Sequence, residues 1–217
     1  MIDWHQIDTV LLDMDGTLLD LHFDSHFWLE HLPQRYAQLH RLDQNAARDY
    51  IIPRIMAEKG TLNWYSLDYW SDQFGVDILA LKREVQHLIG FRSDALNFLQ
   101  WLKQADPKVI LATNADRPGL ALKLEATGLT EYLDEIVSSA DLGLPKEDPV
   151  FWHALNQRSP FKPQRTLLID DNEQVLNSAR HYGIQWLLTI AQPDSRSPER
   201  TLTEYPAIDQ FYHLTQS

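Results

Sequence analysis

Short uninterrupted apolar runs recur along the chain, and they predict strands of a buried parallel sheet. These runs lack the apolar–polar alternation of a half-exposed strand, which is typical of strands covered on both faces. The five runs are Val10–Leu12, Val109–Ala112, the weaker Glu135–Val137, Thr166–Ile169 and Trp186–Ile190. Apolar residues at helical spacing predict helices between them, over 94–103, 118–127, 149–157 and 173–182. Because strands alternate with helices, we expect a doubly wound α/β fold with a parallel sheet.

Residues 21–90 break this alternation. The segment has no clear strand, and its many aromatic and apolar residues recur at helical spacing. It is therefore predicted to be a helical cap inserted after the first strand, with residues 1–20 and 91–217 forming the core. Near the end of the chain, the polar, proline-containing stretch 193–200 predicts a loop, and 205–214 predicts a short helix that docks back on the core.

Polar side chains follow the predicted strands at the points where these end. Asp13-Met14-Asp15-Gly16-Thr17 follows the first strand, Thr113-Asn114 ends the second, and Asp170-Asp171 follows the fourth. Lys146 lies in the loop after the third. Right-handed crossovers bring the carboxyl ends of parallel strands to one edge, where ligands bind in open α/β sheets. The sequence therefore predicts one site that gathers four carboxylates, a hydroxyl, an amide and an ammonium.

Several carboxylates in one cleft require a cation. Two like charges about 4 Å apart repel each other by about 4 kcal/mol at an effective dielectric constant near 20. The set contains only oxygen ligands and an amine, and the chain has no cysteine. Such ligands favour a hard ion, so we expect Mg²⁺ rather than Zn²⁺, sharing its site with a substrate phosphate.

Composition and charge narrow the range of partners. The 217 residues carry a net charge of −12, which argues against binding of a nucleic-acid polymer, because such binding needs a basic surface. No apolar run approaches the length of a membrane span, and the first residues lack the basic start and apolar stretch of a signal peptide. We therefore expect a cytoplasmic protein without a membrane partner, either a monomer or a weak homodimer.

The polar motifs carry a family resemblance. Asp13-x-Asp15-Gly16-Thr17, Thr113-Asn114, Lys146 and Asp170-Asp171, in this order, resemble the four motifs of the haloacid dehalogenase (HAD) superfamily. The position of the helical segment resembles members with a cap between the first two motifs. The cap stretch 61–70, with 19–21 and 145–148, further resembles the bacterial nucleotidases of this superfamily that act on GMP and IMP.

The resemblance implies a magnesium-dependent phosphatase acting on small phosphorylated metabolites, foremost purine 5′-monophosphates. Asp13 would be the nucleophile that forms an aspartyl-phosphate, and Asp15 would protonate the leaving oxygen and then activate water. Thr113 and Lys146 would hold the phosphoryl oxygens, with Asn114 assisting. The implied metal ligands are Asp13, Asp15 through its backbone carbonyl, Asp170 and Asp171, the last either as a ligand or as a neighbour of one.

Several alternatives stay open at this point. Asp171 can also cap the helix that begins near Glu173. In the cap, Trp64, Leu67, Trp70 and Phe74 are expected on one face of a single helix and fit a small apolar core. Tyr65 and Asp68 point elsewhere and are candidates to contact a purine. Arg92, where the chain re-enters the core, is a candidate phosphate contact. A sugar-phosphate phosphatase or a phosphomutase of the same superfamily is the main alternative function, and a non-catalytic protein that binds a phosphate ligand is another.

Overall fold

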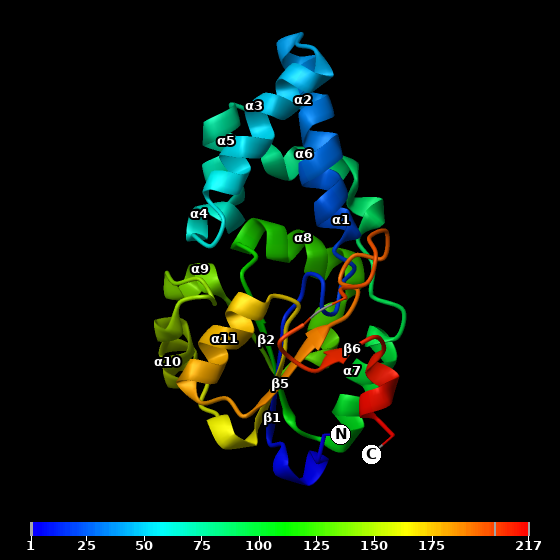
Figure 1. The fold of residues 1–217 in the computed structure, drawn as a ribbon, viewed down its shortest axis with the longest axis vertical. Helices are drawn as coiled ribbons and strands as arrows, with labels where there is room; N and C mark the ends of the chain where they lie inside the picture. The colour runs from blue at the N-terminus through cyan, green and yellow to red at the C-terminus, as the bar shows by residue number, and fades with distance from the viewer. Residues whose placement is uncertain (1, 202, 217) are drawn as a thin grey trace.

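The computed structural model describes residues 2–201 and 203–216 of the chain. Its centre is a parallel sheet of six strands in the order β3-β2-β1-β4-β5-β6 (Figure 1). The strands are β1 (Thr9–Leu12), β2 (Lys108–Thr113), β3 (Glu135–Ser138), β4 (Thr166–Ile169), β5 (Trp186–Ile190) and β6 (Ala207–Ile208). All five predicted strands are confirmed, as is the doubly wound α/β fold.

The last strand was not predicted. The stretch 205–214, expected to be a short helix, instead contributes β6, which pairs in parallel with β5, followed by a 3₁₀ turn over Phe211–Leu214. Phe211 is buried and stacks on Phe98, with their ring centroids 4.7 Å apart. The segment therefore does dock on the core, as expected, but partly as a strand.

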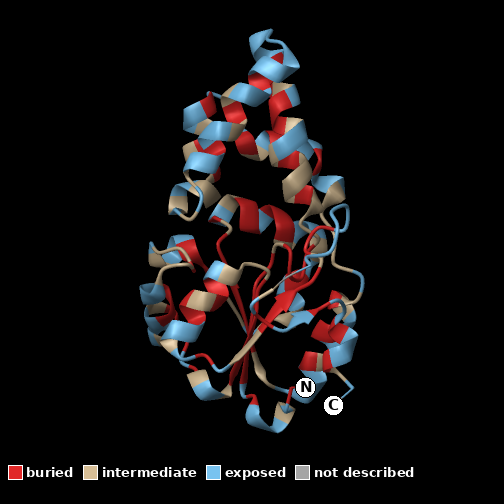
Figure 2. Cartoon of the chain, in the orientation of Figure 1, coloured by how far each residue is buried: buried red, intermediate tan, exposed pale blue. Residues whose placement is uncertain are grey.

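Helices cover both faces of the sheet. The strands are buried along most of their length (red in Figure 2). Alternate residues of β1 enter different apolar clusters: Leu12 belongs to the cluster that contains Leu99, and Leu11 to the one that contains Trp152. The core helices are α7 (Ala95–Ala105), α8 (Arg117–Thr127), α9 (Ser139–Leu142), α10 (Pro149–Arg158) and α11 (Glu173–Tyr182). The four predicted core helices are confirmed. Burial on both faces explains why the strands are continuous apolar runs.

Helical turns make up the ordered structure between residues 22 and 88, which lies beyond one end of the sheet (Figure 1). In chain order they are α1 (His22–His26), a π-helical turn (Phe27–His31), α2 (Leu32–His40), α3 (Gln44–Ala57), α4 (Leu62–Tyr65), α5 (Leu67–Phe74), α6 (Ile78–Glu84) and a 3₁₀ turn (Gln86–Leu88). Their apolar residues form a cluster that Leu122 of α8 joins and in which Trp70 is 1% exposed. The boundaries 21–90 for a cap domain remain our proposal, which this cluster supports because all its other buried members lie within 21–90.

One helix expected in the cap is two. A single helix was expected to carry both Trp64 and Phe74, but the chain interrupts it at Ser66 between α4 and α5. The Ser66 hydroxyl oxygen accepts a hydrogen bond from the Tyr69 N–H at 3.2 Å and so caps the start of α5. Within the described ranges, none of the helices has the length and apolarity that a membrane span requires.

Candidate active site

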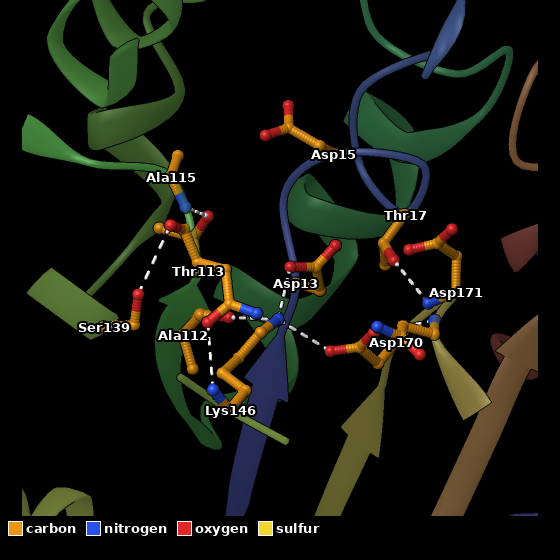
Figure 3. A network of polar contacts seen from close by, with 12 residues as sticks. Asp13, Asp15, Thr17, Ala112, Thr113, Ala115, Ser139, Lys146, Asp170 and Asp171 are labelled. Carbon is orange, nitrogen blue, oxygen red and sulfur yellow. Dashed lines mark hydrogen bonds and ion pairs between the residues drawn. The ribbon is translucent and has the colours of Figure 1, made fainter. Parts of the chain in front are cut away.

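The site forms where β1 ends between β2 and β4. Leu12 is level with Leu111 on one side and Ile169 on the other, and the Asp13 N–H still donates to the Ile169 carbonyl at 3.0 Å. The carboxylate of Asp13 therefore emerges directly beside those of Asp170 and Asp171 at the carboxyl edge of the sheet (Figure 3). The predicted convergence of strand ends is what brings these groups together.

Lys146 lies at the centre of this group. Its ammonium is 2.5 Å from Asp13 Oδ1 and 2.7 Å from Asp170 Oδ2, and it also donates to the Ala112 carbonyl at 3.0 Å (Figure 3). The residue is 1% exposed. Burial lowers the pKa of Lys146, but attraction by Asp13 and Asp170 outweighs it and raises the pKa above its ordinary value. Lys146 thus holds a permanent positive charge beside the nucleophile candidate.

The neighbouring carboxylates need more positive charge than Lys146 supplies. Burial raises the pKa of Asp13 to about 6, and burial together with repulsion from Asp13 and Asp170 raises the pKa of Asp171 well above its ordinary value. One oxygen from each of these three carboxylates lies within 4.8 Å of the others. A buried all-oxygen set with excess negative charge is chemically suited to Mg²⁺. The residues present therefore fit the expected ion.

Gly16 lets the first motif approach Asp171 closely. It has a φ of +83°, and a Cβ at this position would lie 2.8 Å from Asp171 Cγ. The next residue, Thr17, accepts a hydrogen bond from the Asp171 N–H at 3.1 Å. On the solvent side, the Arg200 guanidinium donates to the Asp171 carbonyl and lies 3.4 Å from its Oδ2. Asp171 is thus held by the first motif and not only by its own loop. The helix α11 is capped instead by Asn172.

Thr113 and Asn114 line the same cleft from the end of β2. The Thr113 hydroxyl oxygen accepts from the Ala115 N–H at 3.0 Å, so its proton can be donated to another acceptor (Figure 3). The amide of Asn114 is used at both ends: Oδ1 accepts from the Lys146 N–H at 3.0 Å, and Nδ2 donates to Glu147 at 2.9 Å. In this arrangement Asn114 fixes the loop that carries Lys146.

Glu147 connects the core with the cap. Its carboxylate accepts hydrogen bonds from the Tyr65 hydroxyl at 2.7 Å, from Asn114 Nδ2, and from Asn172 Nδ2 at 3.0 Å. Tyr65 belongs to α4 in the cap and lines the cleft as expected, but its hydroxyl is engaged by Glu147. Glu147 was not among the predicted site residues, and the stretch 145–148 contributed only to the family resemblance.

Asp15 points away from the other carboxylates of the site (Figure 3). Its Oδ1 lies 2.6 Å from the ammonium of Lys123 on α8, and its side chain is 23% exposed. Burial raises the pKa of Asp15 to about 6, against the opposing attraction of Lys123. Lys123 was not among the predicted site residues, because in the sequence it looks like an ordinary polar position of a helix.

The structure does not bring two of the predicted residues into the cleft. Asp68 is exposed on α5 and is not among the residues that line the cleft. The guanidinium of Arg92 turns toward the end of the chain, where it donates to the backbone carbonyls of Gln192 and Asp209. Arg92 therefore secures the returning tail, and its expected contact with a substrate phosphate has no geometric support.

The cleft has a volume of about 690 Å³ and spans the core and the cap. Its deep end holds the carboxylates, Lys146 and Thr113. The cap contributes the apolar end of the cleft, which is lined by Trp28, Ile52, Ile55, Met56, Trp64 and Leu67 and also by the polar residues Ser25, Lys59 and Lys82. Such a cleft suits a molecule with a charged head and a flat apolar body.

The comparisons with known proteins agree with this geometry. A family model described as haloacid dehalogenase-like hydrolase matches residues 7–183. The chain is 41% identical over 216 residues to GMP/IMP nucleotidase YrfG of Escherichia coli (strain K12), which covers 100% of this chain and 97% of that protein. It is similar in fold to a HAD phosphatase from Thermococcus onnurineus, with a TM-score of 0.80, 20% identity and 96% of each chain covered. The HAD-hydrolase YfnB from Bacillus subtilis, solved bound to magnesium, matches with a TM-score of 0.66, 18% identity and coverage of 97% and 99%. The resemblance seen in the sequence is therefore confirmed: the chain is an enzyme of the haloacid dehalogenase-like hydrolase family.

Proposed function

We propose that this enzyme is a magnesium-dependent phosphatase that hydrolyses small phosphomonoesters through an aspartyl-phosphate on Asp13. The observation that carries the proposal is the buried group of Asp13, Lys146 and Asp170 at the deep end of the cleft, where Lys146 lies within 2.7 Å of both carboxylates. A nucleophile beside a fixed cation suits phosphoryl transfer, which depends mainly on positioning and on stabilisation of charge.

In the first proposed step, a carboxylate oxygen of Asp13 attacks the phosphorus atom, and the bond between phosphorus and the ester oxygen breaks. Asp15 gives its proton to the departing oxygen, so the product leaves as an alcohol. Lys146 and the Thr113 hydroxyl hold the phosphoryl oxygens during the transfer. Mg²⁺, held by Asp13, Asp170, Asp171 and the backbone carbonyl of Asp15, would neutralise the negative charge shared by the carboxylates and the phosphate.

In the second proposed step, Asp15 takes a proton from a water molecule, whose oxygen attacks the phosphorus of the aspartyl-phosphate. The bond between phosphorus and Asp13 breaks, which releases inorganic phosphate and restores the Asp13 carboxylate and the protonated Asp15. The two steps together add one water across the ester bond.

We further propose that the substrates are purine 5′-monophosphates such as GMP and IMP. The 41% identity to a protein named a GMP/IMP nucleotidase supports this choice. So does the apolar end of the cleft, where Trp28 and Trp64 offer aromatic surface on which a purine can stack. We also propose a cytoplasmic location and a monomer or weak homodimer that works without nucleic-acid polymers or membranes as partners.

A phosphate-release screen over nucleotides and sugar phosphates, with Mg²⁺ or EDTA, tests the proposed function. We expect release from GMP and IMP with Mg²⁺ and none with EDTA. Preferential release from sugar phosphates would favour the alternative phosphatase, and an isomeric product without free phosphate would identify a phosphomutase. Binding of nucleotides without any turnover would show a non-catalytic protein and contradict the proposal.

A further inference from the structure

An ion-pair network of alternating charges leads from Asp15 into the cap. The Lys123 ammonium lies 2.6 Å from Asp15 Oδ1 and 2.6 Å from Asp24 Oδ2, and the Lys82 ammonium lies 2.6 Å from Asp24 Oδ1. Both lysine side chains are nearly inaccessible, at 5% exposure for Lys123 and 3% for Lys82. The two ammonium charges are therefore neutralised by the neighbouring carboxylates rather than by solvent.

The members of this ion-pair network come from both the core and the cap. Asp15 lies in the turn after β1 and Lys123 on α8 of the core, whereas Asp24 lies on α1 and Lys82 on α6 of the cap. Lys82 is fixed further by aromatic rings, with its ammonium 4.7 Å from the centroid of Phe23 and 4.6 Å from that of Phe27. The place of Lys123 is thus determined jointly by its own helix and by the cap.

Stability alone is a weak reason for burying these charges. Removing two lysines and two aspartates from water costs several kcal/mol for each ion, and apolar residues of similar volume often stabilise such a site equally well. The ion-pair network also ends on Asp15, the proposed general acid and base. Asp15 has to reach first the ester oxygen and then a water molecule. A carboxylate that performs two proton transfers benefits from a fixed orientation, because small misplacements at a reacting group are costly in rate.

We infer that Lys123 is a positioning residue that orients the Asp15 carboxylate for proton transfer, and that Asp24 and Lys82 make this orientation depend on the seated cap. The inference rests on the proposed phosphatase function. Lys123 need not touch the reacting atoms, since its two short contacts are with carboxylates. When the cap moves away from the core, Asp24 moves with it and Lys123 becomes free to shift. Asp15 is therefore fully oriented only when the cap is seated and encloses the substrate.

Two aryl phosphates of nearly equal size, phenyl phosphate and p-nitrophenyl phosphate, test the inference with Lys123→Met. Phenolate is a basic leaving group that needs a proton from Asp15, whereas p-nitrophenolate leaves without one. We expect kcat/KM for phenyl phosphate to fall by about 30- to 100-fold, in the range for a displaced general acid, and that for p-nitrophenyl phosphate by less than about fivefold. Lys82→Met should also lower kcat/KM for phenyl phosphate more than kcat/KM for p-nitrophenyl phosphate, but by a smaller factor than Lys123→Met.

Control variants separate positioning from folding and binding. Lys103→Met makes the same substitution at an exposed core lysine whose ammonium donates to the Glu131 carbonyl, and it should change neither value. If Lys123→Met does not fold, Lys123→Met/Asp24→Asn removes one charge of each sign and should show the same skew. Equal losses for both aryl phosphates, or no loss, would overturn the inference alone. A wild-type enzyme that hydrolyses neither compound would overturn the proposed function together with it.

Discussion

The hydroxyl of Tyr65 in the cap donates a 2.7 Å hydrogen bond to Glu147 Oε1 in the core. Glu147 directly follows Lys146, and both residues are also held by the side chain of Asn114. The contact therefore connects the cap to the loop that presents the ammonium to Asp13. One hydrogen-bonded network thus links the position of the cap to the position of Lys146.

Tyr65→Phe should weaken the closed cap for every substrate. Loss of one hydrogen bond of about 1 kcal/mol predicts a KM raised roughly fivefold, both for IMP and for a small ester such as glycerol phosphate. Steady-state kinetics on both compounds provide the measurement. Tyr69→Phe is the matched control, because the Tyr69 hydroxyl bonds to Glu58 within the cap. A rise confined to IMP would show that Tyr65 recognises the nucleoside instead.

Gly16→Ala should impair metal binding as well as stability. A Cβ here meets Asp171 Cγ at 2.8 Å, and the φ of +83° is unfavourable for alanine. We expect a loss of about 1–3 kcal/mol in unfolding free energy from the backbone alone, and a weaker response of activity to added Mg²⁺. Gly75→Ala carries a similar backbone strain, at a φ of +64°, but its Cβ meets no heavy atom within 4 Å. Equal magnesium titrations for the two variants would contradict the close-contact argument.

Stabilisation by Mg²⁺ should increase as the pH rises from about 5 to about 7. Burial raises the pKa of Asp13 from the ordinary 3.8 to about 6, so the folded protein holds this proton more tightly than the unfolded chain does. That contribution to stability is fully present below about pH 4 and is lost as the pH rises through about 6. Protons and Mg²⁺ compete for the same oxygens, so the difference in Tm with and without Mg²⁺ should widen over this window.

Thermal unfolding at several pH values, with and without Mg²⁺, gives this difference directly. Asp170→Asn is the informative comparison, since it removes one carboxylate of the proposed ion site and should reduce the stabilisation at every pH. A difference in Tm that stays constant with pH in the wild-type protein would argue that these carboxylates do not hold the ion.

Trp64→Leu should affect nucleotides more than small esters. Trp64, on α4 of the cap, lines the apolar end of the cleft and does not belong to the motifs at the edge of the sheet. Stacking of a base on an aromatic side chain contributes about 1–3 kcal/mol, which predicts a KM for IMP raised by roughly 5- to 150-fold. KM for glycerol phosphate should change little. Trp101→Leu, on α7 of the core, is the control for general loss of a tryptophan. Equal effects of Trp64→Leu on both substrates would remove Trp64 from base recognition.

Sequence patterns predicted the sheet because its strands are buried on both faces. A strand such as Thr166–Ile169 is buried throughout and carries three consecutive apolar residues, which distinguishes it from its surroundings. The two residues of β6 carry no such pattern, and their pairing with β5 depends on the returning tail. The interruption at Ser66 was missed because the apolar spacing continues across it, although serine at a helix start is a known signal.

The candidate site was predictable only where the topology fixes it. Asp13, Thr113 and Asp170 meet because neighbouring parallel strands end together, which follows from the order of elements. Lys123 and Glu147 were missed because their roles depend on how α8 packs on the sheet and how the cap packs on the core, which no local pattern specifies. The same reason applies to Arg92, whose partners at Gln192 and Asp209 lie about a hundred residues later in the chain.

The central claim is that an aspartyl-phosphate forms on Asp13. Rapid acid quenching tests it most directly, when the enzyme is quenched while it turns over IMP that carries a label in its phosphate. We predict that label is trapped on the protein as an acyl phosphate that hydroxylamine releases, and that peptide mapping places it on Asp13. Asp13→Asn, which should fold like the wild type by circular dichroism, should trap no label and release essentially no phosphate. Phosphate release by the wild-type enzyme without trapped label, or label on another residue, would contradict the account.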